Sequence, residues 1–64
     1  MKVIRRHPRR EIHIEGPMTV RALLEHLDIV PETVLVIRDS DLLTRDQRLE
    51  ADDTVELRPV ISGG

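Results

Sequence analysis

No cysteine occurs among the 64 residues of this chain. Without cysteine, neither a disulfide framework nor a cysteine-ligated metal stabilises the fold, and no side chain can act as a thiol nucleophile or carry a persulfide. No apolar run approaches the length of a membrane-spanning helix, and the opening MKVIRRHPRR lacks the apolar stretch of a signal peptide. We therefore expect a cytoplasmic protein that does not associate with membranes.

Phe, Tyr and Trp are also absent. Proteins that bind single-stranded nucleic acid generally stack bases on aromatic side chains, so direct sequence-specific binding of nucleic acid is disfavoured. The core must then be built from Val, Ile and Leu. A chain of this length buries only about 60% of the surface that it exposes when unfolded, so we expect one domain with one small core.

Alternation of apolar and polar residues predicts strands near both ends of the chain. MKVIRR and EIHIE alternate on either side of HPRR, where Pro8 interrupts the pattern, and together they predict a first hairpin. TVLVI and TVELRPV predict two later strands, with Val55 and Leu57 pointing inward in the last one. Between them, LLTRDQRL fits a short edge strand and a bend.

One helix is predicted within MTVRALLEHLDI. The i, i+3, i+4, i+7 spacing of a single apolar stripe is occupied by Val20, Leu23, Leu24 and Leu27. Thr19 is the expected N-cap, because its hydroxyl can accept a hydrogen bond from the first turn. The order of elements predicts an α+β fold, with a mixed four- to five-stranded sheet and the helix packed on one face. The final strand is expected at the centre, beside the first.

The chain ends in VISGG. We expect a domain over residues 1–59 and a flexible, exposed tail over residues 60–64. From Pro59 to Gly64 an extended chain reaches about 20 Å, at about 3.4 Å per residue, which is enough to enter another protein's active site. Glycine has no Cβ and passes a narrow channel. The terminal carboxylate is a poor electrophile, but activation by ATP would convert it to an acyl-adenylate open to a sulfur or amine nucleophile.

Over its whole length the chain resembles the ThiS/MoaD-type sulfur carriers, small bacterial relatives of ubiquitin with the β-grasp fold. The resemblance rests on the first hairpin, on MTVRALLEHLDI as the single helix, on PETVLVIRDSDLLTRDQRLEADDTVELRPV as the later strands and on ISGG as the tail. It implies that an E1-like adenylyltransferase uses ATP to adenylate Gly64, which then becomes a thiocarboxylate. It also implies a sulfur donor, either a cysteine desulfurase or a rhodanese, and a downstream enzyme that accepts the sulfur.

Within these carriers, the compact length is closer to the thiamine-thiazole and tRNA-thiolation types than to the longer molybdopterin type. PETVLVIR and ISGG are most similar to the carrier for tRNA 2-thiouridine. The lack of cysteine fits this interpretation, because sulfur would be held on the C-terminal carbonyl carbon. The carrier itself is expected to bind no cofactor and to be a monomer.

Two other functions remain open. A ubiquitin-like protein modifier would use the same tail and be conjugated to lysines through Gly64. A non-catalytic β-grasp adaptor would have an inert tail and act through its surface. Deleting Gly64 would end the function of a carrier or a modifier, whereas an adaptor would tolerate the deletion.

Two groups of residues are candidates for contact with a partner. The tail residues expected to thread into its active site are Ser62, Gly63 and Gly64. The residues expected to form a docking surface are Leu35, Ile37, Arg58, Val60 and Ile61. Leu35 and Ile37 lie on the face of their strand opposite Val34 and Val36, and the sequence leaves open whether that face is core or an exposed interface.

Charged residues form two clusters in a chain whose net charge is −2. The basic cluster, near the start, contains Arg5, Arg6, His7, Arg9 and Arg10. The acidic cluster, near the end, contains Glu50, Asp52, Asp53 and Glu56. A solvated hairpin tip is the simplest interpretation of the basic cluster, and docking of an acidic partner or contact with tRNA phosphate is the alternative.

Neither a metal site nor a catalytic site is predicted. The three histidines lack the spacing of metal ligands. The aspartates fit turn positions, and a core this small leaves no room for a catalytic pocket around them. We therefore expect that the chain is not an enzyme and that a partner performs the chemistry.

Overall fold

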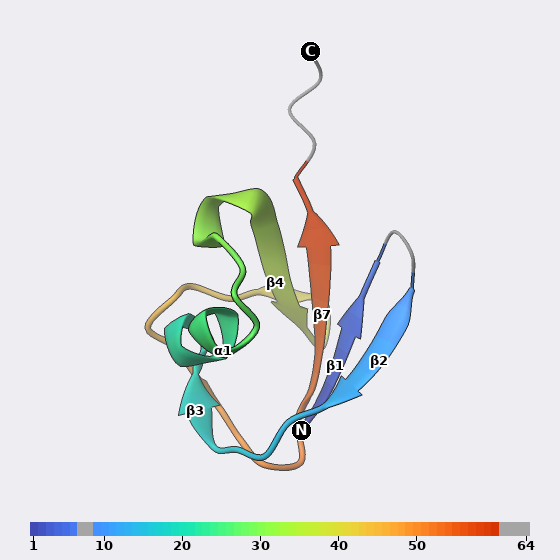
Figure 1. Ribbon diagram of the computed structural model, residues 1–64. Coiled ribbons are helices and arrows are strands. Elements are labelled where there is room, and N and C mark those ends of the chain that lie inside the picture. Colours follow the sequence, from blue (N-terminus) through green and yellow to red (C-terminus); the bar gives the residue numbers. More distant parts are fainter. Residues whose placement is uncertain (7–8, 61–64) are drawn as a thin grey trace.

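The computed structural model describes residues 1–6 and 9–60. A five-stranded sheet carries helix α1 on one face (Figure 1). The elements are β1 (Lys2–Arg5), β2 (Arg10–His13), β3 (Met18–Thr19), α1 (Val20–His26), the 3₁₀ helix η1 (Pro31–Thr33), β4 (Val34–Arg38), β5 (Asp41–Leu42), β6 (Arg48–Leu49) and β7 (Thr54–Pro59). Over these described residues, the predicted α+β class, first hairpin and single α-helix are confirmed.

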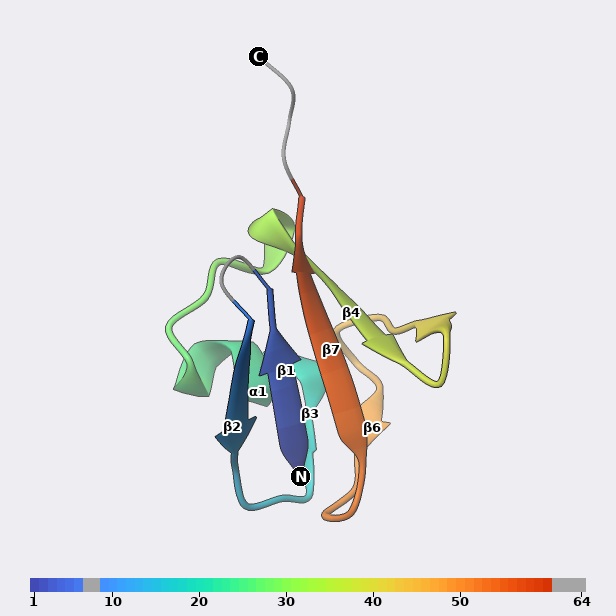
Figure 2. The same ribbon diagram turned by 90° about the vertical axis from the view of Figure 1, so that its right-hand side faces the viewer.

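β7 occupies the centre of the sheet, whose strand order is β2-β1-β7-β4-β5 (Figure 2). It pairs in parallel with β1, which places Val3 beside Val55. It pairs antiparallel with β4, which places Val36 beside Leu57. The prediction that the last strand lies centrally beside the first is confirmed. The strand that leads to the tail is therefore held on both sides.

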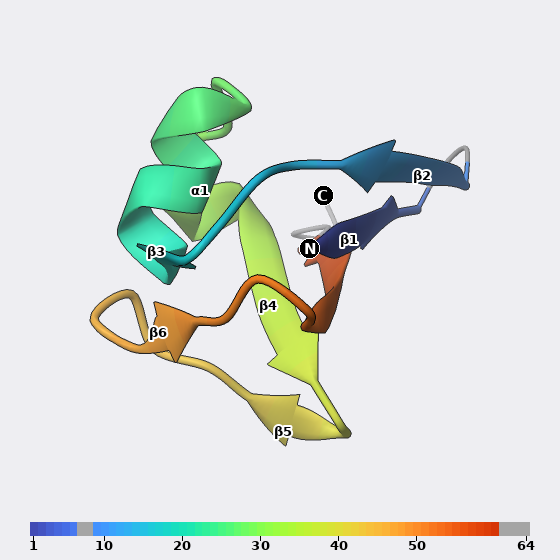
Figure 3. The same ribbon diagram turned by 90° about the horizontal axis from the view of Figure 1, so that it is seen from below.

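The core lies between α1 and one face of the sheet, and Figure 3 shows from below how the helix and the strands are arranged. Every second side chain of β1, β4 and β7 points toward the helix, because successive residues of a strand face opposite sides. The largest fully buried side chains are Val3, Val20, Leu23, Leu24, Leu49, Val55 and Leu57. All of them are aliphatic, as the composition requires.

Helix α1 begins at Val20, directly after the predicted N-cap, Thr19. The Thr19 backbone is extended, and its Oγ1 accepts a hydrogen bond from the Ala22 N–H at 3.1 Å. This bond satisfies one of the amides that the first helical turn leaves without a partner. The helix ends at His26, and Leu27 is its C-cap.

β3 and β6 form a second sheet, which the sequence did not predict. It joins Met18 to Leu49 and Thr19 to Arg48. Strands of two residues are too short for alternation to be recognised. The short η1 helix was missed for the same reason. The edge strand and the bend expected in LLTRDQRL are present, as β5 and a turn at residues 45–46.

A polar cluster connects three segments at the end of the sheet away from the tail. Arg38 Nη1 donates to the Arg48 carbonyl at 3.0 Å and to Asp53 Oδ2 at 2.9 Å. Asp53 Oδ2 also accepts from the Glu50 N–H at 2.8 Å. The Glu50 N–H is the main cause that lowers the pKa of Asp53, with Arg38 adding to it against partial desolvation. The cluster fixes the loop between β6 and β7.

Candidate functional site

The predicted threading residues lie outside the described part of the chain; they are Ser62, Gly63 and Gly64, and Ile61 lies outside it too. The last described residue is Val60, which follows β7 and is 47% exposed. Its N–H donates to the Thr33 carbonyl at 2.8 Å. The structure thus describes the base from which the tail begins, and the division at residues 59 and 60 stays a prediction.

The face of the sheet opposite α1 carries most of the predicted docking residues. Leu35 lies across from Arg58, and Ile37 lies across from Glu56. Leu42 extends the row beyond Ile37 at the β5 edge. Residues paired directly across strands share a face of the sheet. We call this surface the open face; it consists of Ile4, Leu35, Ile37, Leu42, Glu56 and Arg58.

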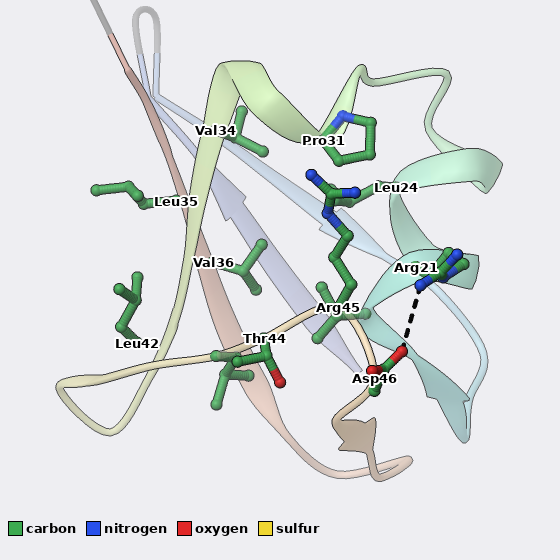
Figure 4. A pocket seen from close by; sticks show the side chains of 12 residues that line it. Arg21, Leu24, Pro31, Val34, Leu35, Val36, Leu42, Thr44, Arg45 and Asp46 are labelled. Atoms are coloured by element: carbon green, nitrogen blue, oxygen red, sulfur yellow. Dashed lines mark hydrogen bonds and ion pairs between the residues drawn. The ribbon is translucent and has the colours of Figure 1, made fainter.

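The structure settles the orientation of β4, which the sequence left open. Val36 is buried, with 4% of its surface exposed, whereas Leu35 is 43% exposed. Figure 4 shows Leu35 on the opposite side of β4 from Val36. Leu35 therefore belongs to an exposed face of the sheet and not to the core, and its contact with a partner stays a prediction.

Ile4, Leu42 and Glu56 are the open-face residues that the sequence-based docking surface did not include, and Leu42 is the most exposed of them. It is 63% exposed, more than any other large apolar side chain among the described residues, whereas Leu43 beside it is buried. The doublet Leu42-Leu43 could have indicated an exposed leucine, because two adjacent residues of an extended segment cannot both face the core.

Glu56 is the charged centre of the open face. One of its carboxylate oxygens, Oε2, accepts hydrogen bonds from Arg58 Nε and from Arg6 Nε, each at 2.9 Å. These bonds, that from Arg58 first, lower the pKa of Glu56 against a smaller effect of desolvation. The Glu56 carboxylate thus holds two guanidinium groups on the open face.

A shallow hollow of about 400 Å³ lies on the open face. Its rim includes Ile4 and Ile37 on the apolar side and Thr54, Glu56 and Arg58 on the polar side. Protein-binding surfaces typically have an apolar centre surrounded by a polar rim that stays in contact with water. The lining, which also includes Asp39 and Ser40, combines apolar and charged side chains and can accommodate a side chain of a partner protein.

A second hollow, of about 480 Å³, lies between α1, β4 and residues 42–46 (Figure 4). Its lining is mainly aliphatic, and Arg21 pairs with Asp46 at 3.3 Å beside it. β5 pairs with β4 only at Ile37 and Arg38, so the earlier part of β4 borders this groove. Of the described residues that line this groove, Leu35 and Leu42 also belong to the open face, and the others do not.

Within residues 1–6 and 9–60, no group of three His, Asp or Glu side chains is arranged to hold a metal ion. His13 and His26 are exposed on β2 and α1, and His7 lies outside the described residues. No helix in the described part of the chain is long and apolar enough to cross a membrane.

Comparison with known protein families matches residues 2–64 to the ThiS family. The chain belongs to the ThiS family. This ThiS-family chain is also 40% identical to the sulfur carrier protein TtuB of Thermus thermophilus, over an alignment of 65 residues that covers 100% of both chains. The resemblance inferred from the hairpin, the helix and ISGG is therefore confirmed, and so is the ubiquitin-like β-grasp fold.

Proposed function

We propose that this ThiS-family protein carries sulfur as a thiocarboxylate on Gly64. The terminal carboxylate attacks the α-phosphate of ATP in the site of an E1-like adenylyltransferase, forming an acyl-adenylate and releasing pyrophosphate. The persulfide of a cysteine desulfurase or a rhodanese then displaces AMP and forms an acyl disulfide between Gly64 and the donor's cysteine. A thiol cleaves this disulfide, which releases the thiocarboxylate and leaves the donor's cysteine in a disulfide with that thiol. The carrier supplies only the acyl group, because the partner enzymes hold ATP and perform the catalysis.

The observation that carries this proposal is the extent of the family match. The chain is a sulfur carrier protein by family and by its full-length similarity to TtuB, and the matched range runs to Gly64. The absence of cysteine leaves the terminal carboxylate as the group to which sulfur can be attached. The family is one of small carriers, which agrees with the expectation that this chain is not a catalyst.

The sulfur is delivered to an accepting enzyme of tRNA thiolation or of thiamine-thiazole synthesis. The similarity of PETVLVIR and ISGG to the carrier for tRNA 2-thiouridine favours the first, and the full-length match to TtuB agrees with a small carrier of this kind.

The open face, together with Val60 and Ile61, is the proposed docking surface for the adenylyltransferase. Leu35, Leu42 and Val60 expose between 43% and 63% of their surface. Exposed apolar side chains that gather on one face of a small protein indicate an interface. β7 lies in the middle of this face, so docking there presents the tail to the partner's active site.

Intact-mass measurement of the protein purified from its own cells, without a C-terminal tag, tests the proposal. A thiocarboxylate adds the mass difference between sulfur and oxygen and is shifted again by an alkylating agent. No thiol in the chain can imitate that second shift, because there is no cysteine. The expected result is the sulfur-bearing species in the full chain and its absence in a variant lacking Gly64.

If the plain carboxylate is the only species even when ATP, an E1-like enzyme and a sulfur donor are supplied, the carrier mechanism is wrong. Isopeptide-linked adducts through Gly64 would then point to a protein modifier. A variant lacking Gly64 that keeps full function would point to an adaptor.

The docking surface is tested separately by L35D, with V30D as the matched control. Both residues are exposed aliphatics, but Val30 lies in the connection between α1 and η1, away from the open face. We expect L35D to weaken binding to the adenylyltransferase about tenfold or more, since buried interface anchors dominate affinity. V30D should bind like the wild type. Equal effects of the two changes would refute the docking surface.

A further inference from the structure

Ion pairing divides the arginines of this chain into two groups. In the described part of the chain, Arg6, Arg9, Arg21, Arg38, Arg45, Arg48 and Arg58 each contact a carboxylate. Arg5 and Arg10 are the remaining two arginines, and no described carboxylate lies within ion-pair distance of either. These two form what we call the Arg5–Arg10 pair.

The Arg5–Arg10 pair is a cross-strand pair: Arg5 on β1 lies directly opposite Arg10 on β2. Like charges placed directly opposite each other in a sheet destabilise it. Arg10 is exposed and Arg5 is half-buried, so solvent screens the repulsion only in part. A local arrangement that weakens the fold without compensation is typical of a functional site.

The pair lies at the end of the sheet from which the tail begins. Arg5 is paired with Leu57 on β7, three residues before Val60. Figures 1 and 2 show the end of β1, the start of β2 and the end of β7 at the same end of the molecule. Because Leu57 faces the core, Arg5 and Arg10 lie on the helix side of the sheet. Arg6 and Arg58 lie at the same end on the open face, where they share the single carboxylate of Glu56. This end therefore carries excess positive charge in a chain whose net charge is −2.

Across the same end of the sheet, beyond β4, the charge is balanced. Glu32 of η1 pairs with Arg45 at 3.2 Å. The positive charge is thus confined to the β1 and β2 side of the base of the tail.

We propose that the Arg5–Arg10 pair docks on a carboxylate-rich surface of the adenylyltransferase, beside the entrance through which it receives the tail. This inference rests on the proposed function. Guanidinium groups bind carboxylates through paired hydrogen bonds, and binding relieves the repulsion between the two arginines. The pair recognises an acidic protein surface and not nucleic acid, because the chain has no aromatic side chain to stack on bases.

The length of the tail limits where that acidic surface lies. Residues 61–64 span at most about 14 Å when extended, at about 3.4 Å per residue. The partner's carboxylates therefore lie close to its adenylation centre. The greatest separation is roughly the length of these four residues plus about 10 Å, the width of two strands.

The test uses the double variant R5Q/R10Q and the matched control R21Q/R45Q, which removes the same charge from two exposed arginines elsewhere. Binding of the full chain to the purified E1-like adenylyltransferase is measured at low and high salt, and pyrophosphate exchange gives KM and kcat. For R5Q/R10Q we expect Kd and KM to rise about tenfold at low salt and kcat to stay unchanged, with the difference shrinking at high salt. R21Q/R45Q should remain near the wild type.

Wild-type affinity in R5Q/R10Q would overturn the inference, and so would an equal loss in both variants. Loss of tRNA binding with unchanged enzyme binding would overturn it in favour of a phosphate contact. If the enzyme does not adenylate even the wild-type chain, the proposed function fails and the inference with it; normal adenylation with no effect of R5Q/R10Q refutes the inference alone. The melting temperature of R5Q/R10Q should equal or exceed that of the wild type. If this variant does not fold, R10E at the exposed position provides the same comparison.

Discussion

The two faces of the central sheet are built from the same strands, yet their chemistry is opposite. On the helix side, Val3, Val55 and Leu57 are almost completely buried against aliphatic neighbours. On the open face, the neighbours of Leu57 along β7 are charged, and Glu56 and Arg58 form an ion pair at 2.9 Å. Alternation along one strand thus separates the residues that hold the fold from those available to a partner.

The energies of the two faces differ as much as their chemistry. Burying one aliphatic side chain contributes about 1.5–3 kcal/mol. An exposed ion pair contributes about 0–1 kcal/mol, because water screens the attraction and ordering both side chains has an entropic cost. Changes on the helix side should therefore act on stability, and changes on the open face on binding.

The strongest test of this contrast compares L57A with R58A. Leu57 is 1% exposed, and its truncation leaves a cavity against α1, so we expect the free energy of unfolding to fall by about 2–5 kcal/mol. R58A removes a larger side chain from the next position but should cost less than about 1 kcal/mol. Urea unfolding followed by circular dichroism at 222 nm measures both. Similar losses in the two variants would remove the distinction between the faces.

A smaller effect is expected at the start of the helix that covers the core. T19A removes the Oγ1 acceptor of the Ala22 N–H and should lower the free energy of unfolding by about 1 kcal/mol. T44A, at an exposed threonine outside the helix, is the control and should have little effect. If T19A is as stable as T44A, the capping bond does not contribute to stability.

The smallest expected effect is on the pH dependence of stability, and it comes from the carboxylates of Glu56 and Asp53. The pKa of Glu56 and of Asp53 is lowered in the folded state, so the folded chain favours the ionised carboxylates. Their stabilisation is fully present above the ordinary carboxylate range, about pH 4, and is lost as pH falls through the lower folded values. E56Q and D53N should each flatten the loss of stability on acidification. E11Q, at an exposed carboxylate of β2, serves as the control in urea titrations across this range.

Sequence alone predicted those parts of the fold in which a pattern is long enough to be recognised. The alternation around Val55 and Leu57 placed the last strand, and the stripe that begins at Val20 placed the helix. β3 and β6 are too short to show any period. The four residues VLVI after Thr33 are all apolar, so only packing against α1 could decide that Val36 faces inward and Leu35 outward.

Sequence alone likewise predicted some features of the candidate site and missed others. Leu35 and Arg58 were expected to contact a partner, and the structure places them side by side on the open face. The opposition of Arg5 and Arg10 depends on the register of the hairpin, and the sequence shows only that both belong to a basic cluster. The roles of Ser62, Gly63 and Gly64 stay predictions, because those residues lie outside the described part of the chain.

The central position of β7 has a consequence for synthesis in the cell. β7 is the last strand to leave the ribosome, and β1 has no partner on its inner side until β7 arrives. Contacts between segments so distant in the chain form late in folding. A chain whose translation stops before Thr54 therefore lacks the middle of its sheet and is exposed to proteases. A partner that recognises the assembled sheet therefore binds only chains in which β7, the strand that leads to ISGG, has already been made.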